Sequence, residues 1–196
     1  RRQRQMCIRD RLLAAKEEKK KGVSMIVCPA SLVFNWGEEF AQFAPKLKVV
    51  LISGNQENRN RLISEAEKYD VLVTSYDLLK RDISNYEGIK FQYEVIDEAQ
   101  YIKNHTTEAA KAVKIIAAKH KYALTGTPIE NRLSELWSIF DYLMPGFLYS
   151  YDTFKREFET PIVKNDDEEA MNRLQKMVHP FILRRLKENV LKDLPD

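Results

Sequence analysis

Two adjacent carboxylates, Asp97 and Glu98, follow a short apolar segment that ends at Ile96. If that segment is a strand of a parallel sheet, both acids lie at the edge where such sheets bind ligands. There Asp97 can hold Mg²⁺, and Glu98 can orient or deprotonate the water that attacks a phosphoryl group. The alternative is structural, because Asp97 could cap the next helix with Glu98 in its first turn. From these two residues alone, both interpretations stay open.

A second polar segment, residues 123–128 (ALTGTP), follows the next apolar run. Gly126 and Pro128 predict a sharp turn, which would present the hydroxyls of Thr125 and Thr127 at the same edge of the sheet. These hydroxyls could sense a bound phosphate or couple it to a neighbouring domain. An ordinary turn with a helix cap is the alternative.

Two more strand ends carry hydroxyls, in residues 26–36 (IVCPASLVFNW) and residues 71–77 (VLVTSYD). Backbone amides and hydroxyls at Ser31, Thr74 and Ser75 can hold phosphates without reading bases. Each of these residues also opens a predicted helix, so we expect helix capping in any case and phosphate contact as an added role.

The elements that must position these residues follow the pattern of an α/β protein. Short apolar runs alternate with segments of helical period, and each run is apolar almost throughout, as in strands covered on both faces. The expected strands are residues 25–28, 48–52, 70–74, 93–96 and 121–125. The expected helices are residues 12–21, 31–43, 60–69, 75–82 and 107–118.

From residue 131 the chain becomes rich in aromatic residues and loses its strand signal. The expected helices there are residues 131–144, 151–159, 166–178 and 181–190. We therefore predict an α/β domain with a parallel sheet and flanking helices, followed by an α-helical extension over residues 131–196. The large aromatic side chains, including Trp36 and Trp137, are assigned to the core rather than to base stacking.

The composition is that of an ordinary globular chain. It is 44% hydrophobic and 31% charged over 196 residues, which excludes a collagen-like or largely disordered protein. The net charge of +3 is too small for a global field that attracts nucleic acid. Two cysteines and three scattered histidines predict neither a disulfide framework nor a metal centre, and a reducing compartment fits best. No apolar stretch approaches the roughly 18 residues that span a bilayer, so we expect no membrane association.

The four strand-end segments, in this order, resemble the first RecA-like lobe of the Swi/Snf family, DNA translocases among the superfamily-two helicase-like ATPases. The resemblance covers residues 12–196. Residues 101–104 (YIKN), 126–131 (GTPIEN) and 183–187 (LRRLK) resemble features that separate Swi/Snf proteins from other helicases. Many members carry His where this chain has Gln100, and the Gln form is a minor variant. The resemblance implies a partial RecA-like parallel sheet over residues 12–130.

The resemblance also implies roles for individual residues. Residues 97–100 (DEAQ) match the Walker B box, and residues 124–128 match the segment that couples hydrolysis to DNA movement. The family's contacts to the tracked DNA strand fall on the segments that contain residues 28–32 and 74–76. The implied coupling residues are Gln100, Thr125, Gly126 and Thr127, and the implied DNA-backbone residues are Pro29, Ser31, Thr74 and Ser75.

The implied cofactors are ATP and Mg²⁺ in the full-length protein, and the implied partners are double-stranded DNA and a second RecA-like lobe. The expected location is the cytoplasm, near the nucleoid, in a bacterium, or the nucleus in a eukaryote. Two alternatives stay open. One is an RNA helicase lobe, and the other is a non-catalytic remnant that acts at most as a weak DNA-backbone or protein-interaction module.

None of the six glycines is followed by Lys, so the 196 residues contain no Walker A loop. We expect no DNA-stimulated ATP hydrolysis from this chain alone. In RecA-like lobes the strand before that loop is interior to the sheet. Its absence predicts unpaired strand groups in a core position, and therefore marginal stability.

Residues 1–11 match nothing in the family and resemble the translation of a transposon end used in sequencing libraries. We therefore predict that they are a non-native arm. The alternative is a genuine basic arm that touches DNA. Five Arg and one Asp give these residues a net charge of +4, so the remaining chain carries −1 instead of +3. The prediction of DNA binding therefore depends on the motifs alone.

Overall fold

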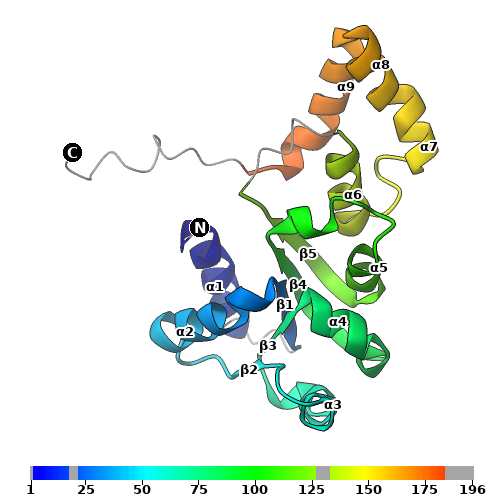
Figure 1. The fold of residues 1–196 in the computed structure, drawn as a ribbon. Coiled ribbons are helices and arrows are strands. Elements are labelled where there is room, and N and C mark those ends of the chain that lie inside the picture. Colours follow the sequence, from blue (N-terminus) through cyan, green and yellow to red (C-terminus); the bar gives the residue numbers. More distant parts are fainter. Residues whose placement is uncertain (1, 18–21, 127–132, 184–196) are drawn as a thin grey trace, which may run out of the picture. The chain divides into compact units, whose positions relative to one another are not determined.

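The computed structural model describes residues 2–17, 22–126 and 133–183 (Figure 1). The chain divides into two compact units, Arg1–Leu148 and Tyr149–Asp196. Helix α6 (Leu133–Leu143), which composition places in the helical extension, falls within the first unit. Ile139 and Tyr142 of this helix lie in the same apolar cluster as strand residues. This packing explains why the boundary between the two units lies after Leu148 rather than at the expected residue 131.

The first unit contains a five-stranded sheet in the order β2-β3-β1-β4-β5 (Figure 1). All neighbouring strands are parallel. Every strand expected from the sequence is present, which confirms the α/β fold with a parallel sheet. The strands are β1 (Ser24–Cys28), β2 (Val49–Leu51), β3 (Val71–Ser75), β4 (Lys90–Asp97) and β5 (Ala117–Leu124).

Helices follow the strands and begin at side-chain caps where the sequence supplies them. Asn55, Ser75 and Thr107 each accept a hydrogen bond from the backbone N–H three residues on. The helices of the first unit are α1 (Arg2–Glu17), α2 (Val33–Phe43), α3 (Gln56–Ser64), α4 (Tyr76–Asp82), α5 (Glu108–Ile115) and α6. The 3₁₀ turns are η1 (Ala30–Leu32), η2 (Ala66–Lys68), η3 (Ile83–Tyr86) and η4 (Ala99–Ile102).

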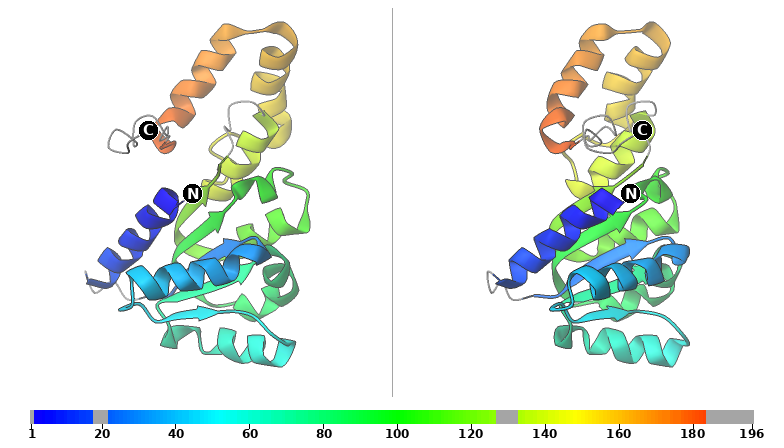
Figure 2. Two further views of the ribbon diagram at one scale, coloured as in Figure 1. Left: turned by 60° about the vertical axis from the view of Figure 1, so that its left-hand side comes forward. Right: turned by 90° about the vertical axis from the view of Figure 1, so that its left-hand side faces the viewer.

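Both faces of the sheet are covered, and the alternation along β1 shows how. Met25 and Val27 face an apolar cluster that includes residues of α3, α4, α5 and α6. Ile26 and Cys28 face a second cluster, to which α1 and α2 contribute. Figure 2 shows α1 and α2 together on one side of the sheet. This double covering explains why β1 and β3 are buried throughout and nearly continuously apolar.

The expectation of unpaired strand groups inside the sheet is wrong for the described strands. β4 pairs with β1 on one side and with β5 on the other, from Lys90↔Ala117 to Asp97↔Leu124. The sheet therefore runs without a gap from β2 to β5, with these two as its edges.

Helix α1 begins ten residues earlier than its expected start at residue 12 and crosses the predicted end of the arm. Ile8, before that boundary, and Leu12, after it, both lie in the cluster that contains Trp36 and Phe40. The packing of Ile8 and Leu12 in one cluster therefore continues across residue 11, and the origin of residues 1–11 stays a prediction.

The second unit is helical where it is described. It contains α7 (Tyr151–Phe154), a π-helical turn (Lys155–Glu159), α8 (Thr160–Asn165), α9 (Glu168–Val178) and the 3₁₀ turn η7 (His179–Phe181). Phe154, Phe158 and Leu174 are its most deeply buried side chains. Two of its expected helices are confirmed, whereas most of the expected helix at 181–190, with residues 184, 185 and 187 of the LRRLK segment, lies outside the described residues.

Among the described helices, none combines the length and the apolar character that a bilayer-spanning segment needs.

Candidate functional site

Asp97 is the last residue of β4, and its buried side chain is held by two donors. Its Oδ1 accepts a hydrogen bond from the backbone N–H of Glu98 at 2.9 Å, and its Oδ2 accepts one from the indole Nε1 of Trp36 at 3.1 Å. The residue that caps the following turn, η4, is Glu98 rather than Asp97, and no side chain caps that turn. The purely capping interpretation of Asp97 therefore fails, and the carboxylate is fixed at the sheet edge.

Glu98 has a left-handed backbone conformation, with φ 53° and ψ 57°. Such a conformation is costly for a residue other than glycine, and it clusters at functional sites. The Glu98 Oε2 accepts a hydrogen bond from the Gln100 Nε2 at 2.8 Å. The Gln100 Oε1 in turn accepts one from the Thr125 hydroxyl at 3.2 Å.

A chain of hydrogen bonds therefore links Thr125, just after β5, through Gln100 to the carboxylate of Glu98. The structure brings these three predicted site residues together with Asp97 at one edge of the sheet. Gly126 follows and is exposed. Thr127 lies outside the described residues, so the second predicted hydroxyl has no structural account.

Ser31 is exposed at η1, the turn that directly follows β1. The capping residues of η1 and α2 are Pro29 and Leu32, and neither helix has a side-chain cap. The expected capping role of Ser31 is therefore wrong, and its hydroxyl lies at the surface near the end of β1. Pro29 itself is buried.

Thr74 and Ser75, the last residues of β3, are 0% and 2% exposed. The Ser75 hydroxyl accepts a hydrogen bond from the backbone N–H of Leu78, so Ser75 caps α4 as expected. The Thr74 hydroxyl lies in the core and does not reach the surface where a phosphate would bind. Of the four predicted DNA-backbone residues, only Ser31 has an exposed side chain.

Two residues at the site were not predicted to touch it. The sequence predicts Trp36 in the core and assigns Tyr76 no individual role within residues 71–77. Trp36 donates to the Asp97 carboxylate, and the Tyr76 hydroxyl donates to the Asp97 backbone carbonyl at 2.9 Å. The available signal was general: a buried indole or phenol needs an acceptor. The sequence alone does not say which acceptor it finds.

Burial raises the pKa of the Tyr76 phenol well above its ordinary value, and the nearby charge of Asp97 raises it further. The phenol is therefore protonated at neutral pH, and its hydroxyl stays available as a donor.

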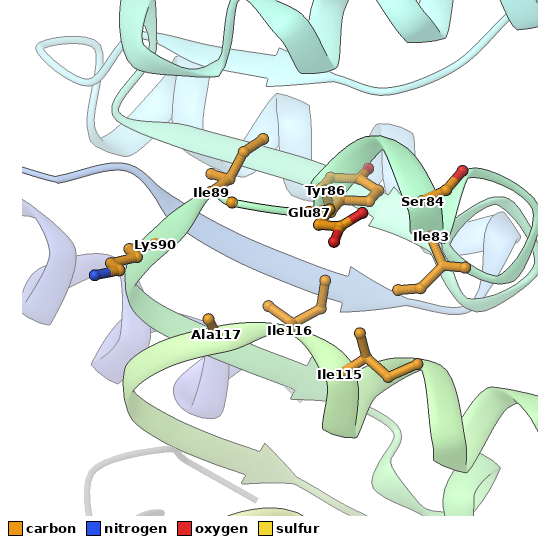
Figure 3. Close-up of a pocket in the computed structure, with 10 residues that line it drawn as sticks. Ile83, Ser84, Tyr86, Glu87, Ile89, Lys90, Ile115, Ile116 and Ala117 are labelled. Atoms are coloured by element: carbon orange, nitrogen blue, oxygen red, sulfur yellow. The ribbon is translucent and has the colours of Figure 1, made fainter.

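A cavity of about 340 Å³ lies at the other end of the strands, where β4 and β5 begin (Figure 3). Ile83, Ile89, Ile115 and Ile116 give it a largely apolar lining. Its position, at the opposite edge from Asp97, separates it from the site described above. Within the described part of the chain, no group of three or more His, Cys, Asp or Glu residues could hold a metal ion.

The model of the SNF2-related domain matches residues 7–196 of this chain, so the match begins five residues before the expected residue 12 and includes residues 7–11. The chain belongs to the SNF2-related family. Its relatives in this family include the TATA-binding protein-associated factor MOT1 of Saccharomyces cerevisiae, which is 45% identical over 183 residues. An uncharacterised ATP-dependent helicase of Mycoplasma genitalium, MG018, is 46% identical over 172 residues.

The SNF2-related chain is also similar to a solved structure, the SWI2/SNF2 ATPase core of Sulfolobus solfataricus in complex with double-stranded DNA. The sequence identity is 42% and the TM-score is 0.85, over 94% of this chain and 38% of that one. The alignments with MOT1 and MG018 each cover 88% of this chain but only 10% and 16% of the relative. The chain therefore spans a small part of the SNF2-related proteins that it resembles.

Proposed function

We propose that this chain is part of the first ATPase lobe of an ATP-driven translocase on double-stranded DNA. The observation that carries the proposal is the hydrogen-bond chain from Thr125 through Gln100 to Glu98, beside the fixed carboxylate of Asp97. A motor needs such a link, because the state of the nucleotide must be passed to the parts that move. The similarity to an ATPase core solved with DNA supports the same function.

In this proposal Asp97 holds Mg²⁺ through water. Mg²⁺ keeps several waters and takes one or two carboxylates together with substrate phosphates, so a single buried carboxylate with a fixed orientation fits it. Glu98 orients the attacking water, and Mg²⁺·ATP supplies the phosphoryl group that is transferred. Gln100, Thr125, Gly126 and Thr127 relay the nucleotide state.

The DNA contacts in this proposal come from two strand ends. Ser31 contacts the phosphate backbone through its exposed hydroxyl. Pro29, Thr74 and Ser75 are buried, so their segments contribute backbone groups rather than side chains. Contacts of this kind carry no sequence information, as a motor that moves over any sequence requires. A second RecA-like lobe completes the nucleotide site in the full-length protein.

A second candidate is a non-catalytic module that binds DNA backbone or protein weakly. It is favoured for the isolated 196 residues because none of their glycines precedes a lysine, so the phosphate cradle is missing. We propose that the isolated chain hydrolyses no ATP. The proposed location is the bacterial cytoplasm, near the nucleoid, or the nucleus in a eukaryote.

The test is ATP hydrolysis by the full-length protein that carries this chain, with duplex DNA, with RNA and without nucleic acid. We expect duplex DNA to stimulate hydrolysis and Glu98→Gln to reduce the stimulated rate by about 100-fold or more, because the attacking water loses the carboxylate that orients it. Glu108→Gln, an exposed acid on α5, is the matched control and should leave the rate unchanged. Stimulation by RNA alone, or a fully active Glu98→Gln variant, would contradict the proposal.

A further inference from the structure

An aromatic residue that donates a hydrogen bond to Asp97 lies shortly after the first predicted DNA-backbone segment, and another lies at the end of the second. After Ser31, the chain enters α2, where Trp36 donates to the Asp97 carboxylate. After Ser75, the next residue is Tyr76, which donates to the Asp97 backbone carbonyl. Two segments separated in sequence therefore meet at one acid.

Trp36 controls the orientation of the carboxylate. It is 1% exposed and Asp97 is 2% exposed, so water does not substitute for the indole N–H at Oδ2. A hydrogen bond to an ionised group is short and roughly twice as strong as a neutral one. Without Trp36, Asp97 would lose one of the two donors described here.

Tyr76 controls the peptide group between Asp97 and Glu98. Its hydroxyl binds the carbonyl oxygen of Asp97, directly before the residue in the left-handed conformation. Its ring stacks on Tyr101 at 5.1 Å between centroids, with 4° between the planes. The turn η4, which contains Tyr101, thus fixes the Tyr76 ring from the other side. The Tyr76 phenol helps to hold the Glu98 backbone in place.

The strands beneath these side chains act as a rigid base. β1 pairs with both β3 and β4, with Cys28 beside Ser75 and Val27 beside Ile96. The helix starts beyond the strand ends are not part of this ladder. A displacement of η1 and α2, or of the start of α4, therefore moves an aromatic donor relative to an acid that the sheet holds still.

We propose that Trp36 and Tyr76 are positioning residues that couple DNA contact to the geometry of Asp97 and Glu98. The inference rests on the proposed function. DNA bound at Ser31 shifts the indole N–H against the Asp97 carboxylate, and DNA bound near Ser75 shifts the phenol against the Asp97 carbonyl. Both displacements change how the two acids face the nucleotide. The alternative role is structural, in which the two groups only satisfy buried donors.

The experiment uses the full-length protein with Trp36→Phe and Tyr76→Phe, which keep a ring and remove the donor. The controls are Trp137→Phe, a buried indole outside the site, and Tyr93→Phe, a buried phenol on β4 whose hydroxyl has no described acceptor. Three quantities are measured: the ratio of DNA-stimulated to basal ATP hydrolysis, the Mg²⁺ concentration for half-maximal rate, and the affinity for duplex DNA.

For Trp36→Phe we expect the stimulation ratio to fall and the Mg²⁺ requirement to rise by about 10- to 100-fold, as for other residues that orient a metal ligand. For Tyr76→Phe we expect the stimulation ratio to fall by about 3- to 10-fold, because a neutral hydrogen bond is lost. DNA affinity and both control variants should match the unmodified protein. Unchanged ratios and Mg²⁺ requirements in both variants would show a structural role only.

A second readout does not depend on turnover. The protein with Glu98→Gln is labelled with 5-fluorotryptophan, and the Trp36 fluorine resonance is assigned by its loss in Trp36→Phe. Duplex DNA should shift this resonance without nucleotide, and Asp97→Asn should reduce that shift. If duplex DNA does not shift the Trp36 fluorine resonance, the inference is wrong. If Glu98→Gln itself leaves hydrolysis intact, the proposed function fails instead, so the two failures are distinguishable.

Discussion

Outside the site, a buried ion pair joins Arg59 of α3 to Asp82 of α4. The guanidinium donates from Nε to Oδ2 at 2.6 Å and from Nη2 to Oδ1 at 2.8 Å. The two residues are only 7% and 1% exposed. Because Arg59 also donates to the Gly54 carbonyl, the pair ties the loop before α3 to the end of α4.

Asp82→Ala should lower the free energy of unfolding by about 3–5 kcal/mol, because it leaves the Arg59 charge buried without its partner. The matched control is Glu65→Ala, which removes the partner of Lys68 in an exposed pair and should cost far less, because water screens exposed charges. Urea unfolding of the chain measures both. Equal losses in the two variants would mean that Arg59 finds water or another acceptor.

The residues that carry the site divide into those that a motif predicts and those that only packing shows. Asp97, Glu98, Gln100 and Thr125 lie in two short motifs after apolar strands, and the structure brings them together. The hydrogen bond from Trp36 to Asp97 joins residues 61 positions apart, so no local pattern encodes it. The burial of Thr74 depends likewise on side chains from other elements, so no local pattern encodes it.

At the scale of elements, β5 is an edge strand attached to β4 partly by an ion pair. Lys121 Nζ lies 3.2 Å from Oε2 of Glu94, and it also lies 4.7 Å from the ring centroid of Tyr142 on α6. Glu94 is fully buried, and its carboxylate oxygens make no well-formed hydrogen bond. Burial therefore prevails over the lysine charge and raises the pKa of Glu94 from 4.5 to about 7.

This raised pKa predicts a pH dependence of stability. Between about pH 4.5 and about pH 7 the folded chain binds more protons at Glu94 than the unfolded chain does. The free energy of unfolding contributed by Glu94 therefore falls as pH rises through this window and is constant above it. The groups that face Glu94 are Lys121 and the phenols of Tyr142 and Tyr76.

Glu94→Gln should remove this dependence. We expect the difference in unfolding free energy between the unmodified chain and the variant to change by about 3 kcal/mol or less from about pH 5 to about pH 8, in favour of the variant at high pH. Denaturant unfolding across this range measures it. A difference that does not change with pH would mean that Glu94 ionises normally in the folded chain.

The extent of β5 shows why element boundaries are harder to predict than element types. The sequence predicts a strand at residues 121–125 and assigns Ala117 and Ala118 to the preceding helix, residues 107–118. The strand nevertheless begins at Ala117, because β4 supplies backbone partners from Lys90 onward whatever the side chains are. Half-exposed polar residues are tolerated on an edge strand.

At the scale of the whole molecule, the two compact units differ in how much apolar surface they bury. The sheet of the first unit is covered on both faces, and every residue of β1 is at most 5% exposed. The second unit buries a much shorter set of apolar side chains, with Phe154, Phe158 and Leu174 most deeply buried. Regions with few buried apolar contacts open at lower free energy than a sheet core does.

Native-state hydrogen exchange should therefore be slowest at the amides of β1 and β3 and faster by about 10-fold or more in α8 and α9. Mass spectrometry of peptides after timed exchange measures this for each element. Helix α3, which buries Leu62 and Ile63, is an internal reference within the first unit. If α9 is protected as strongly as β1, the second unit is stabilised by more than its own buried side chains.

The position of β1 in the sheet also affects the timing of folding. Its partners are β3 and β4, and the register joins Ser24 to Val71 and Ile26 to Val95. These pairs close long loops, and their entropic cost is incurred before the contacts form. During synthesis, β1 leaves the ribosome long before β4 does. The central strand β1 therefore stays apolar and paired on one side at most until β4, which ends at the acidic site, has been synthesised.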